Sequence, residues 1–135
     1  MPEEQIAAPP AETRWAIALD WFALNHRSAA VLVNDYLCSI CVKRRGDKKE
    51  PAPKVLLATI HSCCSQVPDF INDRLPIMES AFRLFLRNGN QPLTLREMSS
   101  ALNKARYGDV YRTSPELLLR ILKNDHFYGL QEIIE

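Results

Sequence analysis

Apolar residues recur at helical spacing along most of the chain, and Pro, Gly and capping residues separate the segments. Behind the capping residue Ser28, apolar positions keep this spacing and predict a helix that runs to about Lys43. Another broad apolar face predicts a helix from Lys54 to about Gln66, and Pro68 ends it. The first half of the chain is therefore expected to be helical.

The second half carries clearer start and stop signals. A stripe of apolar positions from Ile77 predicts a helix that ends at Asn88-Gly89, a C-cap pattern. Thr94 and Glu97 have the spacing of a capping box. We expect a helix over 94–104, a helix over about 114–124 that begins with Ser114-Pro115, and a closing strand over 127–133.

The N-terminal residues are read differently. Residues 1–12 contain little to bury and are expected to form a flexible tail. Trp15 and Ile17 alternate with alanines, which favours a short strand or an extended arm, and Asp20 can cap a short helix after it. We expect a helical cysteine-rich part over 13–74 and a second helical domain over 75–135.

Composition places the chain among ordinary globular proteins. Apolar residues make up 47% and charged residues 24%, and the net charge of +1 gives no global attraction to nucleic acid or anionic membranes. The longest apolar runs are far shorter than a membrane span, and the acidic N-terminus does not read as a signal peptide. We therefore expect a cytoplasmic protein with reduced thiols and no membrane partner.

Four cysteines form the main chemical signal. Cys38 and Cys41 make a C-x-x-C motif, and the adjacent Cys63 and Cys64 follow on the next predicted helix. Two antiparallel helices joined by a Pro-containing loop would bring the pairs together, as a tetrahedral zinc site requires. A zinc ion is thus the expected cofactor, and an iron–sulfur cluster is the weaker choice because ferredoxin spacings are absent.

Adjacent cysteines pose a geometric problem for one shared ion. On a regular helix, Cys63 and Cys64 point about 100° apart, so both bind one ion only if the helix frays there or the ion lies between the two directions. His61 precedes Cys64 by three residues and shares its face, so it is the substitute ligand. Two alternatives stay open: four small core residues, or a thiol-based redox sensor.

No pattern of an enzyme accompanies the cysteines. The chain has no H-E-x-x-H, no G-x-S-x-G and no Gly-rich phosphate loop, and it contains only four glycines. We therefore expect a non-enzymatic protein without a small-molecule substrate or catalytic residues. The expected function is a zinc-stabilised interaction or regulatory module, with a protein partner or self-association.

Residues 77–135 resemble the winged helix-turn-helix class, in particular the HARE-type domain. The resemblance rests on the order of Arg87-Asn88-Gly89, Pro92-Leu93-Thr94, Thr113-Ser114-Pro115-Glu116 and the final Phe127-Tyr128-Gly129-Leu130. It implies a mainly α fold in which the N-terminal metal-binding part precedes three helices with a minimal β-sheet. The usual two-stranded wing is expected to be cut to one strand or absent.

DNA binding by the helix at about 114–124 is the alternative function that this resemblance implies. The residues expected to contact nucleic acid are Lys104, Arg106, Arg112, Arg120 and Lys123. The segment from Leu75 onward nevertheless has eight cations against seven anions, so weak or no specific binding is expected. The whole chain also resembles a small bacterial family with a C-x-x-C followed by a Cys-Cys pair, which implies a designed cysteine feature and no activity.

Overall fold

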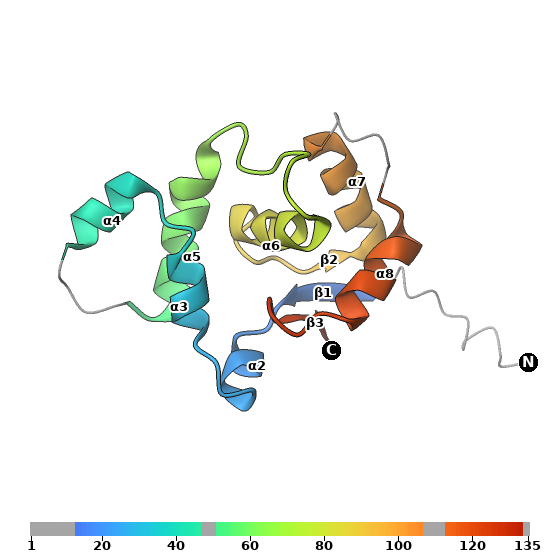
Figure 1. Cartoon of the computed structure of the whole chain (residues 1–135), viewed down its shortest axis with the longest axis horizontal. Helices are drawn as coiled ribbons and strands as arrows, with labels where there is room; N and C mark the ends of the chain where they lie inside the picture. Colours follow the sequence, from blue (N-terminus) through green and yellow to red (C-terminus); the bar gives the residue numbers. More distant parts are fainter. Residues whose placement is uncertain (1–12, 47–50, 107–112, 134–135) are drawn as a thin grey trace, which may run out of the picture.

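The computed structural model describes residues 13–46, 51–106 and 113–133, so the tail predicted over residues 1–12 lies outside the described part. The protein is mainly helical, with a small antiparallel sheet, which confirms the predicted fold class (Figure 1). None of the helices in the described ranges is long and apolar enough to cross a membrane. The elements in chain order are β1 (Arg14–Ile17), α2 (Leu19–Leu24), α3 (Ala29–Asn34), α4 (Ser39–Arg45), α5 (Pro53–Ser62), the 3₁₀ turn η2 (Cys64–Gln66), α6 (Ile77–Arg87), β2 (Leu93–Thr94), α7 (Leu95–Ala105), α8 (Pro115–Lys123) and β3 (Leu130–Ile133).

The N-terminal strand β1 is the central strand of the sheet. It pairs antiparallel with β2 on one side and β3 on the other, so Trp15 lies opposite both Leu93 and Glu132. Asn90 extends the β2 side, because its amide accepts from the backbone N–H of Ile17 at 2.8 Å and donates to its carbonyl at 3.0 Å. Residues 14–17 thus join a sheet whose other strands come from the second half of the chain.

Helix α6 lies at the centre of the apolar core (Figure 1). Its Phe82 and Phe85 are completely buried, and it contacts α5, η2, α7 and β1. The buried residues form one continuous cluster that includes both β1 and α5. The cysteine-rich helices and the C-terminal helices therefore share one core, which fixes the position of α5.

Several helix ends lie where capping residues in the sequence predict them. Thr94 and Glu97 form the capping box of α7, and the Ser114 side chain accepts from the backbone N–H of Leu117 at the start of α8. Helix α6 ends at Arg87 with Asn88 as its C-cap, and Gly89 follows with a φ of +75°. Asp20, in contrast, lies in the first turn of α2, and Ala18 occupies the N-cap.

The single helix predicted from Ser28 to about Lys43 is wrong, because the chain forms two short helices there. Helix α3 ends at Asn34, and α4 starts after Cys38, so Cys38 lies at a helix start rather than near a helix end. In a continuous helix the backbone N–H of Cys38 would pair with the carbonyl of Asn34. It donates instead to Cys64 Sγ at 3.2 Å, while Leu37 takes the carbonyl of Asn34. A tertiary contact of the cysteines thus replaces a helical hydrogen bond.

Replacement of Gly129 by alanine should destabilise the protein by about 3 kcal/mol or more, measured by urea unfolding. Gly129 has a φ of +68°, and an added methyl carbon would lie 2.5 Å from Phe22 Cε2. The matched control is Gly89→Ala, since φ is +75° there and the nearest atom, in the His61 ring, is 3.5 Å away. Equal losses of stability in the two variants would contradict the steric argument.

Candidate metal centre

Each of the four cysteines lies at the end of a helical segment. Cys38 is the N-cap of α4, and Cys41 is in the first turn of that helix. Cys63 is the C-cap of α5, and Cys64 is the first residue of η2. The start of α4 therefore faces the end of α5, as the two pairs of cysteines require.

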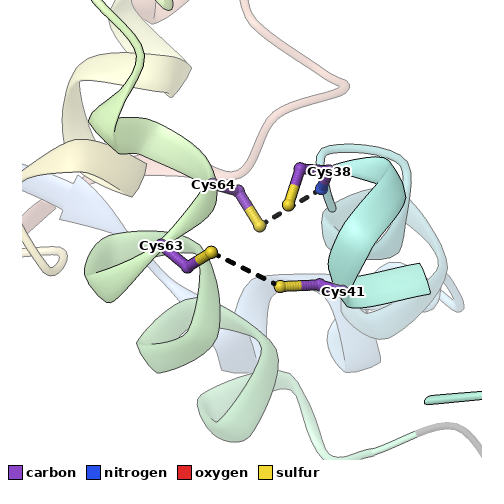
Figure 2. A group of neighbouring side chains, drawn as sticks. All are labelled: Cys38, Cys41, Cys63 and Cys64. Atoms are coloured by element: carbon purple, nitrogen blue, oxygen red, sulfur yellow. Dashed lines mark hydrogen bonds between the residues drawn. The ribbon is translucent and has the colours of Figure 1, made fainter. Parts of the chain in front are cut away.

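The four sulfur atoms converge on one point (Figure 2). All four Sγ atoms lie within 4.8 Å of one another, and those of Cys41 and Cys63 are 3.7 Å apart. The backbone N–H of Cys38 donates to Cys64 Sγ and ties the two segments together. This group of four thiols can hold a metal ion.

A break in α5 allows the two adjacent cysteines to face the same point. Helix α5 stops at Ser62, and Cys63 leaves the helical region with a φ of −133° and a ψ of −67°. The chain then continues as the 3₁₀ turn that begins with Cys64. The helix therefore ends just before Cys63, as it must if the thiols of Cys63 and Cys64 are both to reach one ion.

The surroundings of the four thiols differ. Cys41 and Cys64 are buried, and burial raises the pKa of both thiols. The side chain of Cys41 is the main cause that raises the pKa of Cys63. Cys38 is the exception, because the backbone amide of Cys41, followed by the Cys64 thiol, favours its thiolate and lowers its pKa to about 7. The surroundings thus favour the thiolate form of Cys38 over that of the other three cysteines.

Helix α4 has little attachment to the protein apart from these thiols. Cys41 is the only buried residue of this helix, all of which the structure describes. Ile40 and Val42 are 61% and 44% exposed, so the aliphatic side chains of α4 contribute little burial. Near its C-terminal end, Arg45 Nη1 donates to the side-chain oxygen of Asn34. The cluster of sulfurs is consequently the principal connection between α4 and α5.

His61, the predicted substitute ligand, lies apart from the sulfur atoms. Its Nδ1 is 2.7 Å from the carbonyl oxygen of Arg87, and its ring packs beside Gly89. The imidazole therefore joins α5 to the end of α6, and the candidate ligands within the described residues are the four cysteines. Sequence reasoning missed the Cys38 amide as a donor to sulfur, because that contact depends on the break between α3 and α4.

The residues predicted to contact nucleic acid differ in their exposure. Lys104, Arg120 and Lys123 are exposed, whereas Arg112 lies outside the described residues. Arg106 is only 7% exposed, and its guanidinium donates to the carbonyls of Asn72 and Leu75 and to Ser80 Oγ. These contacts correct the assignment of Arg106, which holds the loop before α6 against the end of α7.

Comparison of the chain with family models, with curated proteins and with solved structures found no match. The site is therefore interpreted from its own geometry.

Arg106→Ala should lower the free energy of unfolding by about 2–4 kcal/mol, because the buried Ser80 and two partly buried carbonyls would lose a charged donor. Arg106→Lys should restore only part of this loss, since an ammonium group cannot reproduce the planar fork of donors. The control is Lys104→Ala, which removes an exposed cation two residues earlier and should change stability by about 0.5 kcal/mol at most. Thermal unfolding of the three variants checks this. A neutral Arg106→Ala variant would contradict the structural role.

Proposed function

We propose that Cys38, Cys41, Cys63 and Cys64 bind one zinc ion, and that this ion is structural. The protein would then be a non-enzymatic interaction or regulatory module whose small helix α4 is fixed by the metal. The observation that carries the proposal is the convergence of all four Sγ atoms within 4.8 Å.

The distances suit a tetrahedral zinc site. With Zn–S bonds near 2.3 Å, the sulfur atoms at the corners of a tetrahedron lie about 3.8 Å apart. The separation of 3.7 Å between Cys41 and Cys63 already has this value, and the other pairs need only small side-chain rotations. Four thiols packed as ordinary core residues have no need to converge on one centre.

The second argument comes from the groups around the sulfurs. Backbone N–H groups that donate to ligand atoms orient the ligands of metal sites, and the Cys38 amide makes such a contact with Cys64. Helix α4 also buries too little apolar surface to be held by packing alone. A metal ion would supply the missing attachment.

A structural role is favoured over a catalytic one because the protein can supply four thiolate ligands. Catalytic zinc sites keep one position open for water or substrate. Iron bound by the same thiols, or a redox role of the thiols without metal, is an outcome that metal analysis separates from zinc. The DNA-binding alternative has less support, since Arg106 is buried and the exposed Glu116 shares α8 with Arg120.

Protein purified under reducing conditions should contain about one zinc ion per chain. Cys41→Ser should reduce the bound zinc to near zero, because a hydroxyl group is a poor replacement for a thiolate on zinc. The matched control is His61→Ala, which removes the predicted substitute ligand and should leave the zinc content unchanged. Elemental analysis of the three proteins decides the matter. Iron in place of zinc, or wild-type protein without metal, would overturn the zinc assignment.

Removal of the ion by a chelator should loosen α4 selectively. Structural zinc ions contribute about 10–16 kcal/mol of apparent binding free energy in small peptides, and α4 has little other attachment. We expect amide hydrogen exchange in residues 39–45 to become much faster, while α6 stays protected by its completely buried phenylalanines. Exchange is measured by mass spectrometry before and after chelation. Unchanged protection of α4 would mean that packing, and not metal, holds it.

A further inference from the structure

The part of the chain around the cysteines is strongly basic. Between Tyr36 and Pro68 the sequence has six cations against two anions, whereas the rest of the chain has eleven against fourteen. Within the described ranges 36–46 and 51–68 there is no carboxylate side chain at all. The cations in these ranges are Lys43, Arg44, Arg45 and Lys54. We call this described part, with α4, α5 and η2, the basic lobe.

A groove opens between the two helices of the basic lobe. It encloses about 220 Å³ and has apolar walls from Leu37 and Leu56, with Cys41 between them. Arg44 and Arg45 line the same groove from α4. Figure 1 shows α4 at the edge of the molecule, on the side away from the sheet, so a partner can approach it without contacting the core. The groove thus combines an apolar surface with two guanidinium groups.

The two arginines have unused hydrogen-bonding capacity. Arg45 Nε is buried and has no acceptor in the described part of the chain, although Nη1 of the same side chain donates to Asn34. Arg44 is exposed and makes no hydrogen bond or ion pair with any described residue. A carboxylate is the acceptor that guanidinium groups bind best in proteins, and the exposed guanidinium of Arg44 can meet one from a partner.

The exposed side chains of α4 and α5 favour a peptide over a nucleic acid. Ile40, Val42 and Val55 are exposed on α4 and α5, with exposed fractions of 61%, 44% and 53%. Proteins that bind single strands use exposed aromatic rings as platforms for bases. The aromatic residue of the basic lobe, Tyr36, packs against Phe82 instead. Aliphatic side chains and cations together suit a segment that is both acidic and aliphatic.

We propose that the groove between α4 and α5 binds an acidic, aliphatic segment of a partner protein. A carboxylate of that segment pairs with Arg44 and Arg45, and an aliphatic side chain packs on Leu37 and Leu56. The inference rests on the proposed function, since the metal ion holds α4 in place and so forms one wall of the groove. It identifies the chemistry of the partner that the interaction module recognises.

The test is selection of a random-peptide phage library on immobilised, zinc-loaded, full-length protein. The enriched peptides should contain Asp or Glu next to Leu, Ile or Val. A synthetic copy of the strongest peptide should lose at least about tenfold in affinity for Arg44→Glu, which corresponds to one charge-assisted hydrogen bond. The matched control is Arg120→Glu, which makes the same charge reversal on the exposed side of α8 and should bind like wild type. Ile40→Ser should also weaken binding, through loss of aliphatic surface that α4 exposes next to Cys41 in the sequence.

Enrichment of peptides without acidic residues, or equal binding to wild type and Arg44→Glu, would overturn the proposal. The proposal would also be overturned if a random-sequence DNA or RNA strand bound more tightly than the peptide and its binding depended on Arg44. Self-association that Arg44→Glu abolishes, without any peptide enrichment, would overturn it as well. Zinc content is measured on each protein sample. If the protein contains zinc but enriches no acidic peptide, peptide binding by the groove is refuted and the metal site is not. If acidic peptides bind zinc-free protein equally well, the proposed role of the metal in holding the groove is refuted.

Discussion

Four sulfur atoms meet where α4 has almost no other attachment to the protein. This seven-residue helix buries only Cys41 and exposes Ile40 and Val42, so the hydrophobic effect contributes little to its position. The Cys38 amide and the thiols of α5 and η2 supply the contacts instead. The position of α4, the groove beside it and the surface that a partner can reach all depend on this one convergence.

The remainder of the protein is held by a different force. Helix α6 is packed on several sides, and β1 links the beginning of the chain to both β2 and β3. Because α5 belongs to this core through Leu56 and Ile60, it presents Cys63 and Cys64 from a fixed support. A rigid α5 and a weakly packed α4 make a suitable pair for a metal site, since the ion needs to position only one of them.

Short-range signals in the sequence predicted the helices well, and long-range contacts were the source of the errors. The capping box of Thr94 and Glu97 and the cap at Ser114 act within four residues, so they could be recognised directly. At the break before Cys38, the backbone N–H of Cys38 donates to Cys64, which lies 26 residues further along the chain. Arginine is usually found at the protein surface, and only the fold shows that Arg106 is buried against Ser80. The grouping of the four cysteines was predictable because their spacing fitted a turn between two helices. The direction of the His61 side chain, which points to the end of α6, was not predictable from the sequence.

Both departures from regular helix lie at the cysteines, and the charge around these cysteines is positive. Neither cysteine pair lies within an uninterrupted helix: α4 begins after Cys38, and α5 ends just before Cys63. Four thiolates around a divalent cation carry a formal charge of about −2, which a partly buried site does not tolerate without nearby cations. Arg44 and Arg45 line the groove that Cys41 also lines, so they can balance that charge. Arg44 is also exposed, so a carboxylate of the proposed partner could pair with it. With a metal ion bound, the cations of this lobe would balance the thiolate site and would also provide the means by which an acidic partner is recognised.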